Sequence, residues 1–174
     1  MTEPFFRVER LAPQHPRVTF DCGVPALNQY LQQQAMQDVR RNVASCFVAV
    51  NAENALIGYY TLSASSVYLK DLPSTTQKKL PRYADVPVVR MGRLAVASSV
   101  QGQRVGAALL FNALARVCRS EIAAFALLVD AKDEQAVRFY AHQGFERLEV
   151  APALTLFLPL QSIKTHILNE SKSD

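Results

Sequence analysis

The sequence has few cysteines and no long apolar run, and each shortage excludes a class of protein. Its three cysteines, Cys22, Cys46 and Cys118, are widely spaced and form no CxxC pair, so neither a disulfide framework nor a zinc site is expected. No apolar run approaches the roughly 18 residues that a membrane span needs. The first ten residues are charged and lack the apolar core of a signal peptide. We therefore expect a cytoplasmic protein without a metal ion and without a membrane partner.

A large excess of one charge is also missing. The 19 basic and 15 acidic side chains leave a net charge of +4 at pH 7, which permits an anionic partner without requiring one. The length of 174 residues and the 49% of hydrophobic side chains suit one domain with a single core. We expect this domain over residues 1–162. A C-terminal tail is expected over 163–174, because the chain turns polar after Ser162.

Hydrophobic periodicity and turn residues predict a series of helices and strands. The expected order is a helix over 25–39, strands over 46–50 and 56–63, an irregular proline-marked segment over 65–87, a strand over 88–96, a helix over 102–119, a strand over 124–129, a helix over 133–143 and a strand over 155–160. Asp133 can cap the start of its helix and Gly144 can close its end. Gly92, inside a strand, indicates a bulge or a close backbone approach. This order predicts an α/β fold with a mixed sheet.

The segment from Val96 to Ala108 has the features of an anion-binding turn. A strand ends there, a polar turn with Gly102 and Gly106 follows, and an amphipathic helix begins. The free N–H groups and the dipole at a helix start attract phosphate, and Arg104 adds a full positive charge. The pattern is neither the P-loop motif nor the dinucleotide-binding fingerprint. By itself, a glycine pair before a helix is more often ordinary turn chemistry.

The stretch from Gln101 to Ala107 resembles the acetyl-CoA motif of the GNAT acetyltransferases, usually Gln/Arg-x-x-Gly-x-Gly/Ala. The match lies at Gln101, Gly106 and Ala107, and the sequence departs from the motif at Arg104, where the family prefers glycine. Three matches that follow in the family's order make the resemblance far stronger than one motif alone. The other matching segments are 91–96, 130–133 and 138–145.

A further set of matches resembles the GNAT toxins of bacterial type II toxin–antitoxin pairs and covers roughly residues 18–160. Known members of this group acetylate the α-amino group of aminoacyl-tRNA and so stop translation. The resemblance therefore implies an aminoacyl-tRNA substrate and a cognate DNA-binding antitoxin, and it makes a homodimer plausible. The matching segments are 20–23, 27–31, 58–63, 80–83 and 92–96.

The resemblance also implies a fold and a cosubstrate site. The fold is the GNAT (acyl-CoA N-acyltransferase) fold, in which helices flank a mixed central sheet with splayed strands. Acetyl-CoA is the implied cosubstrate, and backbone N–H groups of the strand over 88–96 bind its pantetheine arm. Gly92 eases the splay of that strand. The implied cofactor-binding residues are Leu94, Ala95, Val96, Gln101, Gly102, Gln103, Arg104, Val105, Gly106, Ala107, Asp133 and Ala136.

Tyr140 is the candidate catalytic residue. A phenol ionises near ~10 and a thiol near ~8.5, so a tyrosine can protonate a departing thiolate. In the family the matching tyrosine faces the cofactor sulfur, although a core aromatic is the competing interpretation. The strand over 88–96 has no carboxylate or histidine to act as a base. This weakly favours an α-amine acceptor, because its pKa near ~7.7–8.0 is well below the ~10.4 of a lysine. Glu134 and His142 could still act as bases through water.

Basic side chains between residues 78 and 93 are candidates for holding an RNA backbone. The period of a strand places Arg90 and Arg93 on opposite faces, which argues against a single patch. No interleaving of aromatic and basic residues indicates base-specific reading, so recognition by shape and backbone is expected. The RNA-binding candidates are Lys78, Lys79, Arg82, Arg90 and Arg93.

Two alternatives stay open at this point. The chain could acetylate another amine, such as a peptide N-terminus, a polyamine or a small molecule. It could also be a non-catalytic binding module on a GNAT scaffold, an interpretation that rests on Arg104 in the place of the motif glycine.

Overall fold

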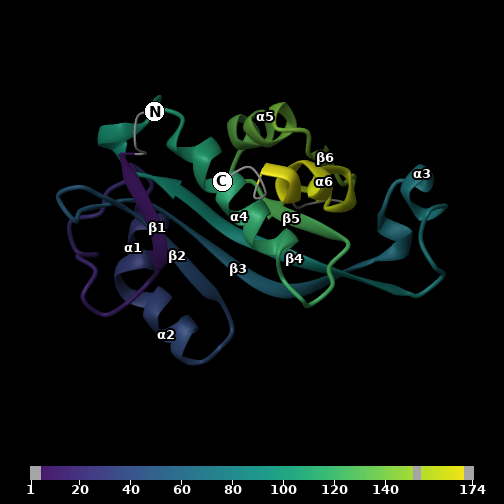
Figure 1. The fold of residues 1–174 in the computed structure, drawn as a ribbon, viewed down its shortest axis with the longest axis horizontal. Coiled ribbons are helices and arrows are strands. Elements are labelled where there is room, and N and C mark those ends of the chain that lie inside the picture. The colour runs from purple at the N-terminus through teal and green to yellow at the C-terminus, as the bar shows by residue number, and fades with distance from the viewer. Residues whose placement is uncertain (1–4, 151–153, 171–174) are drawn as a thin grey trace. The chain divides into compact units, whose positions relative to one another are not determined.

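The computed structural model describes residues 5–150 and 154–170, and its strands form a mixed sheet (Figure 1). The order in the sheet is β1-β2-β3-β4-β5-β7-β6, with β4 and β5 parallel. The strands are β1 Phe6–Arg10, β2 Ser45–Asn51, β3 Leu56–Tyr68, β4 Asp85–Val96, β5 Ala126–Asp130, β6 Glu146–Arg147 and β7 Thr155–Pro159. This confirms the predicted α/β class with a mixed sheet.

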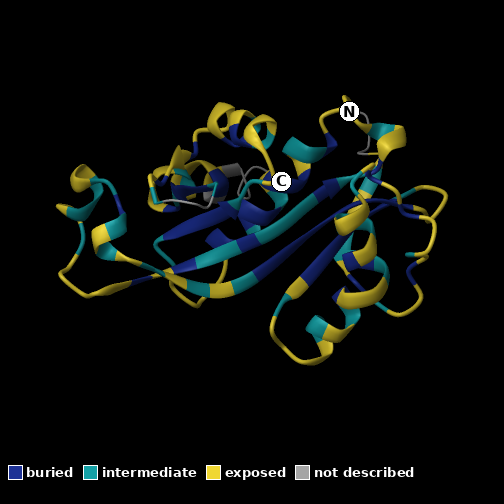
Figure 2. Cartoon of the chain, turned by 180° about the vertical axis from the view of Figure 1, so that it is seen from behind, coloured by how far each residue is buried: buried dark blue, intermediate teal, exposed yellow. Residues whose placement is uncertain are grey.

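Helices connect most of these strands, and short 3₁₀ turns lie at Leu69–Asp71 and Ser98–Val100. The helices are α1 Pro25–Gln29, a π-helical turn Tyr30–Gln34, α2 Ala35–Arg40, α3 Ser74–Gln77, α4 Val105–Cys118, α5 Glu134–His142 and α6 Gln161–Glu170. In Figure 2 the strands are largely buried, whereas the segment around α3 carries exposed and half-buried residues.

The chain divides into two compact units, and β3, β4 and α4 contribute residues to both. The first unit comprises Met1–Ser63 and Gly92–Ala113, and the second comprises Ala64–Met91 and Leu114–Asp174. The first unit holds the predicted anion-binding turn. The second holds Tyr140.

Three buried aromatic rings organise the first unit. Tyr59, on β3, contacts Phe20 edge-on at 5.6 Å and stacks with Tyr30 at 6.3 Å. The Tyr59 hydroxyl donates to the Leu27 carbonyl at 2.7 Å, which ties the first helix to the sheet. The predicted helix over 25–39 is therefore confirmed, with a π-helical turn in its middle.

The segment over 65–87, predicted to be irregular, contains more regular structure than expected. β3 continues to Tyr68, α3 forms over Ser74–Gln77, and β4 begins at Asp85. Buried Leu72 packs in a core cluster with residues of β4, β5 and β7, so apolar packing anchors the segment. The prolines exclude one long element but permit these short ones.

The structure differs from the sequence analysis at both ends of the chain. Strand β1 was not predicted, and it pairs with β2 over Phe6–Arg10. The polar segment after Ser162 is helical as far as Glu170, and Ile167 is buried. Residues 171–174 of the expected tail lie outside the described residues.

Cys22, Cys46 and Cys118 are all free and buried, as expected for small apolar side chains. Among the described residues, no group of three His, Cys, Asp or Glu side chains is placed to hold a metal ion. Among the described helices, none is both long and apolar enough to span a membrane.

Candidate functional site

The anion-binding turn predicted from the sequence has the required backbone geometry. Residues 101–104 form an exposed turn, and α4 begins at Val105. The Ala108 amide donates to the Arg104 carbonyl at 3.1 Å. The amides of residues 105–107 precede that bond, and among the described residues they donate to no group outside the helix. These amides and the dipole of a 14-residue helix suit a phosphate-bearing ligand.

Side chains of the first unit hold this turn in place. The Gln101 amide donates to the Cys22 and Val96 carbonyls, each at 3.0 Å. The Ser98 amide donates to the Asp21 carbonyl at 2.8 Å. Asp21 in turn accepts from the Gly23 amide, and this bond lowers the pKa of its carboxyl. Residues 20–23 therefore hold the turn in place, and the Gln101 side chain contributes two of the hydrogen bonds that do so.

Arg104 has a backbone φ of +64°, in the left-handed region that favours glycine. This is the position at which the sequence departs from the motif glycine. The structure thus shows that the turn accepts an arginine in the conformation that glycine adopts freely. The side chain is exposed, so its guanidinium is available to an anion at the helix start.

Replacing Arg104 by glycine is expected to have little effect on the free energy of unfolding and a larger effect on acetyl-CoA affinity. Relief of the left-handed strain offsets the extra entropy of glycine in the unfolded chain, so the free energy of unfolding should change by less than about 1 kcal/mol. Loss of an exposed charge near phosphate should weaken acetyl-CoA binding about fivefold, and less at high salt. Calorimetric titration with acetyl-CoA measures the effect, with Arg104→Lys as the charge-preserving control. Binding of the glycine variant at wild-type strength would show that the guanidinium does not contact the cosubstrate.

Strand β4 presents the predicted pantetheine-binding residues at its C-terminal end. Its pairing with β5 covers Val88–Met91, and β4 continues beyond that ladder to Val96, as the expected splay requires. Leu94 and Val96 are half-buried and Ala95 is buried. A Cβ added at Gly92 would meet only the Thr61 hydroxyl, at 3.5 Å, so the close approach expected there is not found.

The close approach occurs instead at Gly58 on β3, whose role the sequence analysis missed. A Cβ added there would lie 2.7 Å from Leu109 Cδ1 and 3.0 Å from the Ala95 carbonyl oxygen. The absence of a side chain at Gly58 therefore allows α4, the helix that begins at the anion-binding turn, to pack closely against the sheet. Its place inside a strand was the only available signal.

Tyr140 lies on α5 with its ring buried and its hydroxyl without a protein partner among the described residues. Its ring contacts Phe139 at 5.2 Å and Phe145 at 5.6 Å. The described residues contain no buried side-chain polar atom that lacks a partner, so the hydroxyl oxygen retains contact with solvent. Burial, and secondarily the Asp130 charge, raise the pKa of Tyr140. The phenol therefore keeps its proton at neutral pH.

The ends of α5 agree with the sequence predictions. Asp133 accepts the Ala136 amide at 2.8 Å, and this bond lowers the pKa of the Asp133 carboxyl. Gly144 closes the helix with φ +98°, and buried Phe145 packs back against the Tyr140 ring. Asp133 and Ala136, predicted to bind cofactor, thus form the N-terminal cap of the helix that carries Tyr140.

The candidate bases have surface positions. Glu134 is exposed and forms an ion pair with Arg147 at 3.3 Å, and His142 is exposed. His15, in the loop after β1, is buried and contacts Glu9 at 2.6 Å and the Ala12 amide at 2.8 Å.

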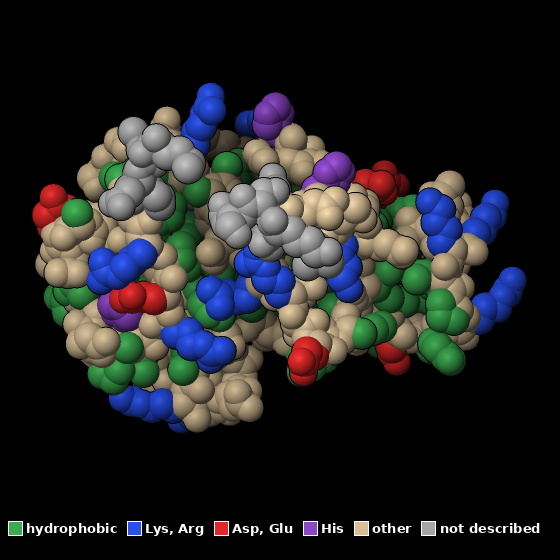
Figure 3. All heavy atoms as spheres, in the orientation of Figure 1, with side chains coloured by type: hydrophobic (Ala, Val, Ile, Leu, Met, Phe, Trp, Pro, Cys, Tyr) green, Lys and Arg blue, Asp and Glu red, His purple; other side chains and the backbone are tan. Residues whose placement is uncertain are grey.

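The five RNA-binding candidates differ in their exposure and in their interaction partners. Lys78, Lys79 and Arg82 are exposed, and Figure 3 shows basic side chains gathered over the α3 segment at the right of the view. Arg90 is engaged by the two carboxylate oxygens of Asp130, at 2.6 and 2.7 Å. Arg93 lies over the Tyr30 ring, 3.5 Å from its centroid. The two arginines of β4 therefore have separate partners, as the strand period predicted.

Comparison with known families agrees with this geometry. Residues 19–153 match the family described as an acetyltransferase (GNAT) domain. Together with the anion-binding turn and the strand ladder that ends at Met91, this match identifies the chain as a member of the GNAT acetyltransferase family.

Within that family, several similar proteins are toxins. A Mycobacterium tuberculosis protein described as a tRNA-acetylating toxin is 33% identical over 144 residues, which are 82% of this chain and 83% of that one. A structure of AtaT complexed with acetyl-methionyl-tRNAfMet is 33% identical with a TM-score of 0.85, covering 92% of this chain and 98% of that one. A mutant AtaT bound to the C-terminus of the antitoxin AtaR and acetyl-CoA is 27% identical with a TM-score of 0.79, covering 94% and 98%.

Proposed function

We propose that the protein transfers an acetyl group from acetyl-CoA to the α-amino group of an aminoacyl-tRNA, and thereby blocks translation as the toxin of a toxin–antitoxin pair in the cytoplasm. The observation that carries the proposal is the helix start at residues 104–107, which follows the exposed turn 101–104 and offers free amides and the exposed Arg104 charge to a phosphate-bearing cosubstrate. The similarity to a tRNA-acetylating toxin and to a toxin complexed with acetylated tRNA supports the acceptor.

The proposed roles follow from the chemistry of each group. Acetyl-CoA supplies the acetyl group as a thioester. The amides at the start of α4 and the Arg104 guanidinium hold its phosphates, and the β4 backbone from Leu94 to Val96 holds its pantetheine arm. As the amine forms the new C–N bond and the C–S bond breaks, Tyr140 donates its hydroxyl proton to the departing sulfur. The proton that the amine loses passes to water, and water returns a proton to the Tyr140 phenolate.

An α-amine suits this set of residues better than a lysine does. Among the described residues of β4 from Val86 to Val96 there is no carboxylate or histidine, so this strand supplies no base. An α-amine with a pKa near ~7.7–8.0 has a substantial unprotonated fraction near neutral pH, whereas a lysine near ~10.4 has almost none. Glu134, already paired with Arg147, is a weak candidate for that role.

An antitoxin is the proposed protein partner. The similarity to a toxin bound to the C-terminus of its antitoxin supports this assignment. Co-expression with the product of a neighbouring antitoxin gene should therefore restore growth, and an acetylation assay should show the purified pair to be inactive.

The decisive test combines the protein, labelled acetyl-CoA and a mixture of charged tRNAs, followed by mass analysis of the modified amino acids. We expect acetyl label on the α-amino group of one or a few aminoacyl-tRNAs, and none on deacylated tRNA. Peptide N-termini and polyamines serve as competing acceptors. Transfer of label to those amines, but never to charged tRNA, would contradict the proposal.

A further inference from the structure

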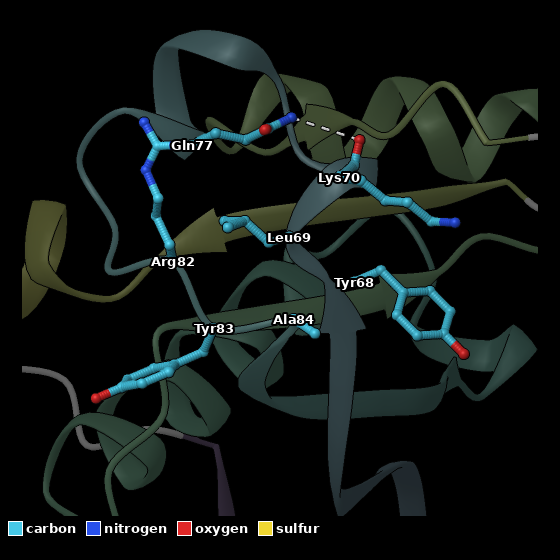
Figure 4. A pocket seen from close by; sticks show the side chains of 7 residues that line it. All are labelled: Tyr68, Leu69, Lys70, Gln77, Arg82, Tyr83 and Ala84. Atoms are coloured by element: carbon cyan, nitrogen blue, oxygen red, sulfur yellow. Dashed lines mark hydrogen bonds between the residues drawn. The ribbon is translucent and has the colours of Figure 1, made fainter.

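Two exposed tyrosines lie together in the segment between β3 and β4. The chain has six tyrosines; Tyr30, Tyr59, Tyr60 and Tyr140 are buried, whereas Tyr68 and Tyr83 are 57% and 72% exposed. Both exposed rings line one hollow of about 480 Å³ in the second unit (Figure 4). Aromatic rings are enriched at binding surfaces, and two exposed rings that share one hollow are a candidate contact site.

The hollow has a fixed backbone frame. The Leu69 amide donates to the Ala84 carbonyl at 2.9 Å, which joins the two sides of the segment. The Gln77 side chain donates to the Leu72 carbonyl at 2.7 Å and to the Lys70 carbonyl at 3.4 Å. Figure 4 shows the two tyrosine rings on opposite sides of the Leu69–Ala84 connection. Both rings therefore project from a segment that backbone and side-chain hydrogen bonds hold in place.

The charged side chains that line the hollow together with both rings are Lys70 and Arg82, which are basic. The Lys70 ammonium lies 5.4 Å from the Tyr68 ring centroid, and Arg82, next to Tyr83, lines the same hollow. Among the described residues, the Arg82 guanidinium has no acidic partner within salt-bridge distance. Asp71 and Asp85 line a second hollow together with Arg90, and Tyr68 lies at the border of both hollows. The Lys70 ammonium thus lies beside the Tyr68 ring, and Arg82 lines the same hollow as Tyr83.

We propose that this hollow binds unpaired nucleotides of an RNA strand, with bases stacked on Tyr83 and Tyr68 and phosphates held by Arg82 and Lys70. Ring faces beside cations match the alternating flat bases and anionic phosphates of a single strand, and such stacking tolerates every base. The inference rests on the proposed function in taking the strand to be part of the tRNA substrate. It adds aromatic stacking to the backbone recognition expected from the sequence.

The absence of tryptophan from the chain allows a site-specific test. Tyr83→Trp keeps a stacking ring and creates a single fluorescent reporter. We expect a single-stranded RNA of about eight nucleotides, within the usual site size, to quench this tryptophan at low salt and less at high salt. The matched control is Phe111→Trp, at a half-exposed position on α4, which should not respond.

Affinity measurements complete the test. Tyr83→Ala should weaken binding of the RNA and of deacylated tRNA from five- to more than a hundredfold, whereas Tyr83→Phe should bind like the wild type. Unchanged acetyl-CoA affinity would show that the alanine variant is folded. Wild-type RNA affinity in Tyr83→Ala would overturn the inference, as would quenching by an antitoxin peptide and not by RNA. If the wild type binds RNA through Tyr83 but acetylates no charged tRNA, the stacking site stands and the proposed function fails.

Discussion

Replacing Tyr140 by phenylalanine is expected to lower kcat for acetyl transfer by about 10²–10⁴-fold, the usual contribution of a general acid. The substitution removes the hydroxyl alone and keeps the ring between Phe139 and Phe145. Because the hydroxyl has no protein partner among the described residues, the free energy of unfolding should stay within about 0.5 kcal/mol of the wild type. Steady-state kinetics and urea denaturation measure the two effects.

The control for this substitution is Tyr59→Phe. The Tyr59 hydroxyl donates to the Leu27 carbonyl at 2.7 Å, so its loss should cost about 1 kcal/mol of stability without a comparable loss of kcat. If Tyr140→Phe lost stability while retaining wild-type kcat, Tyr140 would be a core aromatic and not the proton donor. Growth arrest that survives Tyr140→Phe would likewise contradict catalytic toxicity.

The same residue makes a prediction about pH. Burial, assisted by the Asp130 charge, raises the pKa of Tyr140 above the ordinary ~10 of a phenol. The folded state therefore favours the neutral phenol. This contribution to stability is complete below the unfolded pKa and is lost as pH rises from there through the raised folded pKa. Stability should fall above about pH 10 in the wild type and less steeply in Tyr140→Phe. An activity loss below pH 10 would have to come from another group.

Local signals in the sequence were enough to predict the elements that carry the site. The Asp133 cap, the Gly144 terminus and the helix start after the Gly102 turn each depend on a few adjacent residues, and all are found. Strand β1 was missed because its pairing with β2 joins residues about forty positions apart. The last helix was missed because its polar composition hides the single buried face around Ile167.

The partners of the site residues could not be predicted in the same way. Arg90 and Asp130 are 40 residues apart, and Arg93 meets Tyr30 from a distant segment of the chain. Such contacts depend on strand order, which the sequence pattern does not specify. The exposure of Tyr68 and Tyr83 is equally a property of the folded segment. The residue type alone does not decide whether a tyrosine lies in the core or at the surface.

Gly58 is the position at which a single added methyl group should do the most structural damage. In Gly58→Ala the new Cβ would collide with Leu109 Cδ1 and press on the Ala95 carbonyl, a backbone atom that cannot rotate away. Overpacking of this kind costs about 1–3 kcal/mol, and the larger side chain of Gly58→Val should cost more than its alanine counterpart. Urea denaturation monitored by circular dichroism measures the loss.

The functional consequence follows from where the collision lies. Leu109 is on α4 and Ala95 is on the end of β4 that belongs to the proposed acetyl-CoA site. The Leu109 side chain can rotate away, but relief of the contact with the Ala95 carbonyl needs a backbone shift at that site. Gly58→Ala should therefore also weaken acetyl-CoA binding, measured by calorimetry on the protein that remains folded. Gly92→Ala is the matched control, because its Cβ would meet only the Thr61 hydroxyl at an ordinary 3.5 Å. Equal stability and equal acetyl-CoA affinity in the two variants would mean that the position of α4 does not depend on Gly58. That result would contradict the link between this glycine and the proposed anion-binding turn.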